Sequence, residues 1–202
     1  MRMPEETNRR YRKNRIPEIL NVAARLFREK GFSATSIQDI AQEIGIEKGA
    51  IYYWIKSKDD ILYQLIENEG ERFIQNVSKI IDEEISPDKK LEKFMKKHID
   101  VLTENVDKAS VFFNEHRSLP KKWKSKIIQF RDKYESILRK IIEEGQKEGK
   151  IRKDIDAKII GFAILGMINW VFHWFSKSGR YSSSEIGDAF WEIIYSGIKK
   201  QD

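Results

Sequence analysis

The sequence predicts an all-α protein of about nine helices. Four of its 202 residues are prolines, and no run of useful length alternates apolar and polar residues as a half-buried strand would. Apolar residues instead recur every three or four positions, which is the repeat of an amphipathic helix. With 40% hydrophobic residues, the chain is long enough to bury a core as one body or as two small helical domains.

Several protein classes are disfavoured by what the sequence lacks. Without cysteine it has no disulfide framework and no thiolate chemistry, which fits a reducing cytoplasm. The N-terminus has no apolar segment typical of a signal peptide, and we find no apolar run of 18 residues. We therefore expect a cytoplasmic protein that is neither secreted nor bound to a membrane.

Positive charge is concentrated in the N-terminal part. Residues 1–58 hold 12 Lys or Arg against 7 Asp or Glu, and so carry five of the six net positive charges. This imbalance indicates an anionic partner for that part of the chain. Five cations crowd residues 1–15, namely Arg9, Arg10, Arg12, Lys13 and Arg15. They form either a solvated tail or an arm on DNA phosphates or in the minor groove.

A first helix should begin near residues 14–16, because Pro17 is tolerated only in a first turn, and should end at Gly31. A short helix then starts at Thr35, where Gln38 three residues later completes a capping-box pattern. Gly45 ends this second helix, because a residue without Cβ adopts a positive φ at little cost. Its apolar stripe consists of Ile37, Ile40, Ala41 and Ile44.

A third helix, about Glu47 to Ile55, should bury Ala50, Ile51 and Trp54. Its free face then shows Lys48, Gly49, Tyr52 and Tyr53. Two short helices joined by a glycine turn, the second with a cation and two tyrosines exposed, are typical of a helix-turn-helix whose second helix enters the major groove. Ser57 with Asp60 should cap the next helix, where Lys58 and the free amides form a phosphate site.

Residues on both sides of this helix-turn-helix also follow the pattern of one known family of DNA-binding domains. They are Ile19, Leu20, Ala23, Ala24, Leu26, Phe27, Gly31, Phe32, Thr35, Ser36, Ile40, Ala41, Gly45, Ile46, Lys48, Gly49, Ile51, Tyr52, Ser57, Lys58 and Leu62. With this pattern, the segment resembles the DNA-binding domain of the TetR family of bacterial and archaeal one-component repressors. Glu47, Trp54 and Ile55 depart from it, where a small capping residue, His and Phe are usual.

The resemblance implies two domains. Residues 1–58 would form the three-helix DNA-binding domain with its basic arm, and residues 59–202 a helical domain for ligand binding and dimerisation. The DNA-binding candidates are Thr35, Ser36, Glu47, Lys48, Gly49, Tyr52, Tyr53 and Lys58. A double-stranded operator is the expected partner, and a dimer would place two heads on the half-sites of a palindrome.

The rest of the chain reads as long amphipathic helices. The expected ranges are 59–86, 87–105, 121–149 and 184–200, with the most apolar segment at 154–178. His98 is expected in the core rather than in a site. The aromatic content of 154–178 exceeds what one helix seam can bury, so this segment should face both a partner and a pocket. With the last helix of each chain, it would form a four-helix dimer interface.

Three further runs, at Glu115–Pro120, Glu144–Asp156 and Leu165–Trp170, resemble the branch of the family that responds to fatty acyl-CoA. Such members release DNA when a long-chain acyl-CoA binds, and need no other cofactor or metal. Apolar residues would hold the acyl chain at about 0.8 kcal/mol per buried methylene, and cations near Arg117 would meet the CoA phosphates. The ligand candidates are Phe112, Phe113, Arg117, Lys121, Lys122, Trp123, Phe162, Met167, Asn169, Trp170, His173 and Trp174.

Alternatives remain open for several of these residues. The aromatic residues are equally compatible with a dimer core, and the lysines with a solvated helix face. Asn169, polar within an apolar run, should bond either a partner helix or a ligand, because a buried amide without partners costs a few kcal/mol. The effector could also be another CoA ester or an apolar or cationic drug. An acyl-CoA-handling enzyme is a remote alternative, since no catalytic triad or carboxylate pair is evident.

Overall fold

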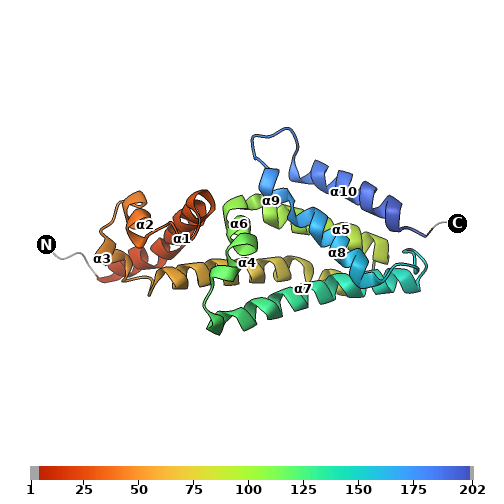
Figure 1. Cartoon of the computed structure of the whole chain (residues 1–202), viewed down its shortest axis with the longest axis horizontal. Coiled ribbons are helices and arrows are strands. Elements are labelled where there is room, and N and C mark those ends of the chain that lie inside the picture. The colour runs from red at the N-terminus through yellow and green to blue at the C-terminus, as the bar shows by residue number, and fades with distance from the viewer. Residues whose placement is uncertain (1–4, 201–202) are drawn as a thin grey trace. The chain divides into compact units, whose positions relative to one another are not determined.

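The computed structural model describes the backbone of residues 5–200 and the side chains of residues 15–200. The all-α prediction is confirmed, since this part of the chain holds ten α-helices, two short 3-10 segments and one isolated β-bridge between Ile151 and Lys199. The α-helices are α1 Glu5–Lys30, α2 Ile37–Glu43, α3 Lys48–Ile51, α4 Lys58–Val77, α5 Pro87–Glu104, α6 Val106–Asn114, α7 Lys121–Lys147, α8 Ala157–Asn169, α9 Val171–Trp174 and α10 Ser183–Ile198 (Figure 1). The 3-10 segments are η1 Ile80–Asp82 and η2 His116–Ser118.

The helices form two compact units. Unit 1 contains the chain up to Glu69 together with Asp107–Ile127, and unit 2 contains Gly70–Val106 and Ile128–Asp202. Residues 59–69 and 107–127 thus pack with the N-terminal helices. The division of function at residue 58 stays a prediction.

The first helix differs from the prediction. α1 begins at Glu5 and contains Pro17 in its interior, so a start near residues 14–16 is wrong. A proline removes a single backbone hydrogen bond, and the Glu, Arg and Lys residues before it have high helix propensity. The side chains of Arg9, Arg10, Arg12 and Lys13 lie outside the described residues, so their role as an arm stays a prediction.

Unit 1 has its own hydrophobic core beneath the helix-turn-helix. Ile19, Ala23 and Phe27 of α1 are buried in it, as their helical spacing predicts. Val111 and Leu119, far along the chain, complete the same core. The core is therefore not assembled from residues 1–69 alone.

The long helix predicted for 59–86 is shorter. α4 ends at Val77, and the turn η1 separates it from α5. Pro87 stands at the first position of α5, where its missing N–H removes no bond. The α5 prediction is confirmed to within one residue.

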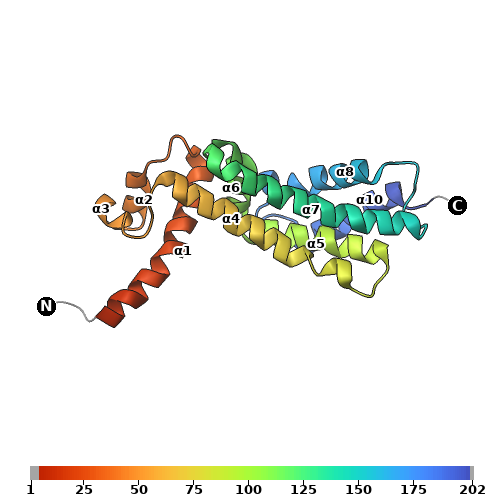
Figure 2. The same cartoon turned by 90° about the horizontal axis from the view of Figure 1, so that it is seen from below.

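Unit 2 is a bundle in which α5 contacts α8, α9 and α10 (Figures 1 and 2). The segment predicted as a single aromatic stretch is two helices that meet at Trp170. Residues 157–174 have a mean hydropathy of 1.3 and could cross a membrane by length and composition. The expectation that the chain has no apolar run of 18 residues was therefore wrong. Within the protein, 39% of this stretch is buried.

Candidate nucleic-acid interface and effector site

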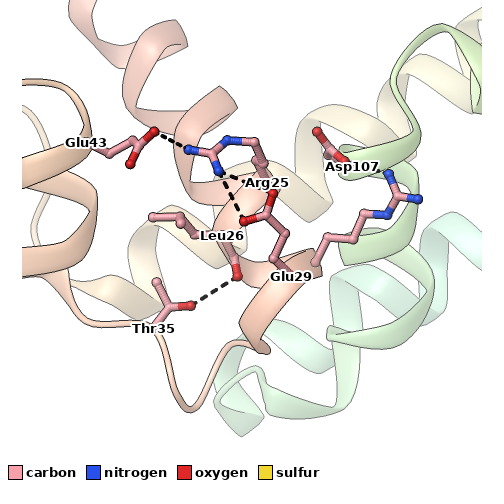
Figure 3. A network of polar contacts seen from close by, with 7 residues as sticks. Arg25, Leu26, Glu29, Thr35, Glu43 and Asp107 are labelled. Atoms are coloured by element: carbon pink, nitrogen blue, oxygen red, sulfur yellow. Dashed lines mark hydrogen bonds and ion pairs between the residues drawn. The ribbon is translucent and has the colours of Figure 1, made fainter. Parts of the chain in front are cut away.

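The loop between α1 and α2 is held by Thr35. Its side chain is 1% exposed, and its hydroxyl donates to the Leu26 carbonyl oxygen at 3.3 Å (Figure 3). It also donates to the Gly31 carbonyl oxygen at 2.9 Å. Gly31 ends α1 with a φ of 85°, as predicted. A buried hydroxyl bound to two carbonyls does not reach DNA, so the structure contradicts Thr35 as a contact residue.

Ser36, not Thr35, caps α2. Its hydroxyl oxygen accepts from the Asp39 amide at 3.1 Å, and the Asp39 carboxylate accepts from the Ser36 amide at 2.7 Å. These two bonds form the capping box, so the pairing of Thr35 with Gln38 is wrong by one residue. The Ser36 amide, and then the Ser36 hydroxyl, donate to the Asp39 carboxylate and so lower the pKa of Asp39. Ser36 remains exposed at the start of the helix, where a phosphate would meet free amides.

The turn between α2 and α3 follows the prediction. Gly45 has a φ of 70°, and the Ile46 amide donates to the Ala41 carbonyl at 2.9 Å. This six-residue closure is a Schellman motif, and it places Ile46 against the core of unit 1. The turn therefore fixes the direction in which α3 leaves α2.

A second anchor between α1 and α2 is Arg25. Its guanidinium donates to Glu29 on the same helix and to Glu43 at the end of α2 (Figure 3). The group is about one-third exposed, so each pair contributes little alone. Together they bring the end of α2 to one face of α1.

Lys58 has a structural role that the sequence did not reveal. Its ammonium donates to the carbonyls of Phe32 and Thr35, both at 2.8 Å, and lies 4.4 Å from the centroid of the Phe32 ring. The ammonium is therefore held against the loop while its charge is kept, and the predicted phosphate contact stays a prediction. The partners are 23 and 26 residues away, so no local pattern could have shown them.

We give the name recognition surface to the exposed residues on and around α3. It consists of Glu47, Lys48, Gly49, Ala50, Tyr52 and Tyr53. Tyr52 is 49% and Tyr53 55% exposed, whereas Ile51 is fully buried and anchors the helix. The prediction that Ala50 is buried is wrong, because α3 is only four residues long and turns away after Ile51. Phenol hydroxyls, an ammonium and a glycine suit base edges and phosphates.

Trp54, which stands where related sequences have His, packs into the core of unit 1. Its ring meets Tyr53 edge to face, with 5.5 Å between centroids. The indole nitrogen is buried and, within the described residues, donates to no acceptor. Trp54 therefore positions Tyr53.

The predicted effector residues are divided between the two units. Phe112, Phe113, Arg117, Lys121, Lys122 and Trp123 belong to unit 1, and Phe162, Met167, Asn169, Trp170, His173 and Trp174 to unit 2. In unit 1, the Trp123 ring stacks on Tyr63 at 4.6 Å, and the Lys122 ammonium lies 4.2 Å from the Trp123 centroid. Arg117 and Lys121 are exposed. Trp123 thus contributes to packing.

Lys126, a cation close to Lys121 and Lys122 in the sequence, forms an ion pair within the protein. Its ammonium pairs with the Glu67 carboxylate, which also accepts from the Tyr63 hydroxyl at 2.8 Å. These bonds raise the pKa of Lys126 and, against the opposing effect of burial, lower that of Glu67. A neutralised cation adds little to a phosphate site.

In unit 2, large apolar side chains remain exposed on α8, α9 and α10. Trp170 is 60%, Trp174 45% and Ile193 64% exposed. His173 is also exposed, and its ring lies 4.0 Å from that of Trp170. These residues therefore line a surface rather than an interior tunnel. Such a surface is typical of a protein interface.

A buried polar group in unit 2 joins three helices. His98 of α5 is 2% exposed, as expected for a core residue, and its Nδ1 shares a hydrogen bond of 2.8 Å with the Tyr134 hydroxyl of α7. Burial lowers the pKa of His98 to about 3, an effect that the side chain of Asn169 on α8 partly opposes. The Asn169 carbonyl oxygen is buried, and among the described residues it accepts no hydrogen bond. The expectation that Asn169 serves a ligand or partner stays a prediction.

Comparison with known proteins covers both parts of the chain. Residues 19–65 match the family described as bacterial regulatory proteins, tetR family, and residues 84–198 match the tetracyclin repressor-like C-terminal domain. The fatty acid metabolism regulator protein of Bacillus subtilis is 28% identical over 182 residues, 90% of this chain and 94% of that protein.

Solved structures agree. The TetR family regulator PfmR from Thermus thermophilus is 33% identical, with a TM-score of 0.82 over 88% of this chain and 97% of the other. AibR, in complex with isovaleryl coenzyme A and operator DNA, is 26% identical, with a TM-score of 0.81 over 90% and 98% of the two chains.

Proposed function

This chain belongs to the TetR family of transcriptional regulators, and we propose that it represses fatty acid degradation genes and leaves its palindromic operator when a long-chain acyl-CoA binds. It is a ligand-responsive DNA-binding repressor and not an enzyme. The genes, the effector and the direction of the response are the parts proposed. Because its DNA target lies in the cytoplasm, we propose that location for the protein.

The observation that carries the proposal is the match to the Bacillus subtilis fatty acid metabolism regulator. It spans 90% of this chain and therefore includes the C-terminal half as well as the widely shared DNA-binding head. A second candidate function is a repressor that responds to another CoA ester. The AibR complex favours it, since that protein is crystallised with isovaleryl coenzyme A.

The homodimer is proposed to form through α8 and α10. Ile159 of α8, Ile193 of α10 and Trp170, which directly follows α8, are each more than half exposed in the single chain. Burying them would gain roughly 25 cal/mol for each Å² of apolar area removed from water. A twofold dimer also supplies the two recognition surfaces that a palindrome requires.

The proposal is tested by a gel shift with an operator fragment that the purified protein selects from random DNA. Native mass spectrometry first establishes the dimer. We expect lauroyl-CoA to release the DNA and free laurate to leave it bound, because only the ester carries phosphates. By linkage, operator DNA must weaken lauroyl-CoA binding by the same factor.

Each other outcome decides between the candidate functions. Release by isovaleryl-CoA but not by lauroyl-CoA would favour the second candidate. DNA binding that neither ester affects would exclude a CoA-responsive repressor. Lys48→Ala serves as the control, because it should weaken DNA binding without weakening effector binding.

A further inference from the structure

The recognition surface carries one acidic side chain, that of Glu47 directly before α3. Glu47 is exposed, and its backbone is extended, with a φ of −68° and a ψ of 143°. It is the N-cap residue of α3, yet its side chain makes no capping hydrogen bond. Helix capping therefore does not account for a carboxylate at this position.

The helix-turn-helix contains two other acidic residues, and both are held within the fold. The Asp39 carboxylate accepts from the amide and from the hydroxyl of Ser36, at 2.7 and 2.8 Å. The Glu43 carboxylate accepts from the guanidinium of Arg25 (Figure 3). Glu47 differs from both, because it forms neither an ion pair nor a side-chain hydrogen bond with any residue that the structure describes.

The backbone on both sides of Glu47 is fixed by hydrogen bonds. The Ile46 amide donates to the Ala41 carbonyl at 2.9 Å, and the Ala50 amide donates to the Glu47 carbonyl, also at 2.9 Å. Ile51 is fully buried and anchors α3. The carboxylate thus extends from a backbone that the fold holds in place, as a specific contact requires.

A free carboxylate on a surface that meets DNA lowers the affinity unless it finds a hydrogen-bond donor. The phosphates repel it, whereas the major groove offers donors in the amino groups of cytosine and adenine. Residues at the N-terminal end of a recognition helix contact base edges, and Glu47 stands directly before the first residue of α3. A base amino group is therefore the donor that its position favours.

Cytosine is the base whose edge suits a carboxylate. Its N4 amino group is a donor, and cytosine presents no acceptor in the major groove. Adenine places its N7 acceptor beside the N6 amino group, while guanine and thymine present acceptors at this edge. A glutamate is therefore favoured at cytosine and disfavoured at the other three bases.

We propose that Glu47 reads one cytosine in each operator half-site, through a hydrogen bond that the N4 amino group donates to its carboxylate. This inference deepens the DNA-binding function and rests on α3 as the recognition helix, but not on acyl-CoA as the effector. The same carboxylate lowers the affinity for other sequences, because without the cytosine it faces acceptors and phosphates.

The test selects operators from random DNA with the full-length protein, in the absence of any CoA ester. The wild type should select half-sites with one fixed cytosine. Glu47→Gln keeps the size of the side chain but can both donate and accept, so it should prefer adenine at that position, where it bonds N6 and N7. Glu47→Ala should accept any base there. Both variants should keep the wild-type preferences at all other positions.

Fluorescence anisotropy with four operators that differ only at that base pair measures the size of the effect. Replacing the cytosine should weaken wild-type binding roughly 5- to 150-fold, whereas Glu47→Ala should bind all four operators within about twofold of one another. Lys48→Ala should weaken binding to the four by a similar factor, because a phosphate contact carries no base preference. Glu143→Gln removes an exposed charge from α7 and, as the control, should keep the wild-type preference.

Three results would each overturn the assignment. They are a wild type that selects no cytosine, a Glu47→Ala variant that keeps the wild-type preference at every position, and a Glu47→Ala variant that binds all four operators more tightly by the same factor. The last would mean that the carboxylate only repels phosphates. The acyl-CoA response has a separate readout, since release of DNA by lauroyl-CoA can fail while the cytosine preference stands.

Discussion

Lys58 contacts Phe32 twice, through a 2.8 Å hydrogen bond to its carbonyl oxygen and through an ammonium that lies 4.4 Å from the centroid of its ring. The same ammonium binds the Thr35 carbonyl. The first residue of α4 therefore closes the loop between α1 and α2. This bond set stabilises the loop that leads into α2.

Lys58→Gln should lower the free energy of unfolding by about 1–3 kcal/mol, because it removes a charged donor from two carbonyls. Urea unfolding of the purified variant measures this. Lys56→Gln is the matched control, since Lys56 is exposed and its substitution should change stability by less than about 0.5 kcal/mol. A Lys58 variant as stable as the control would show that the contacts contribute nothing.

Lys48→Ala and Tyr52→Phe should both weaken operator binding without affecting the fold. For Lys48, the slope of log affinity against log salt should fall by about 1, as expected when one phosphate contact is lost. Tyr52→Phe should cost about 0.5–1.5 kcal/mol of binding free energy, the value of one hydrogen bond. Fluorescence anisotropy at several salt concentrations gives both quantities.

Lys97→Ala, which removes an exposed charge from α5, should leave the salt slope unchanged. If both recognition-surface variants bind the operator like the wild type, α3 is not the recognition helix.

Ile193→Lys should shift the dimer towards monomer, because Ile193 is 64% exposed on α10 and a lysine there would place a charge in the proposed interface. Analytical ultracentrifugation over a range of concentrations measures the shift. Ile85→Lys is the control, since Ile85 is 41% exposed but lies outside α8 and α10. Equal dimer stability in both variants would move the interface elsewhere.

Acid should destabilise the protein partly through His98. The pKa of His98 is lowered to about 3 by burial, whereas an unfolded histidine titrates near 6.5. Between these values the unfolded state binds a proton that the folded state rejects. The contribution of His98 is therefore complete above about pH 6.5, and falls by about 1.4 kcal/mol for each pH unit below it.

His98→Gln should flatten this dependence when urea unfolding is compared at pH 7, 6 and 5. His116→Gln should retain the wild-type dependence, because His116 lies at η2 outside the Tyr134 and Asn169 contacts. If the free energy of unfolding of the His98 variant changed with pH as steeply as that of the wild type, His98 would not contribute to the pH dependence.

Helical periodicity predicted the elements well, but not the local bonds at their ends. The apolar stripes of α2 and α5, and the glycine turns at Gly31 and Gly45, follow from spacing and backbone sterics. Thr35 and Ser36 both precede a polar residue at the right distance, and only the backbone shows which hydroxyl reaches the amide. Thr35 is buried and bonds carbonyl oxygens, whereas Ser36 is exposed and forms the capping box with Asp39.

Contacts between residues that are distant in the sequence could not be predicted from helical periodicity. The bonds of Lys58, the pairing of Lys126 with Glu67 and the hydrogen bond of His98 to Tyr134 span 23 to 59 residues. Lys126 is paired with a carboxylate and Lys58 is bound to carbonyl oxygens, although composition alone counts both as free cations.

The carboxylate of Glu115 accepts from the Phe32 amide at 3.1 Å and from the Ser118 hydroxyl at 3.0 Å. The guanidinium of Arg28 on α1 donates to the carboxylate of Asp107 at the start of α6 at 2.8 Å. A chimera that transplants only residues 1–58 onto another regulator would therefore lose these bonds. It would also lose Val111 and Leu119, and so expose the part of the core that these two residues cover. A portable head must carry α6 and η2 with it, which makes α6 part of any graft designed to exchange DNA specificity.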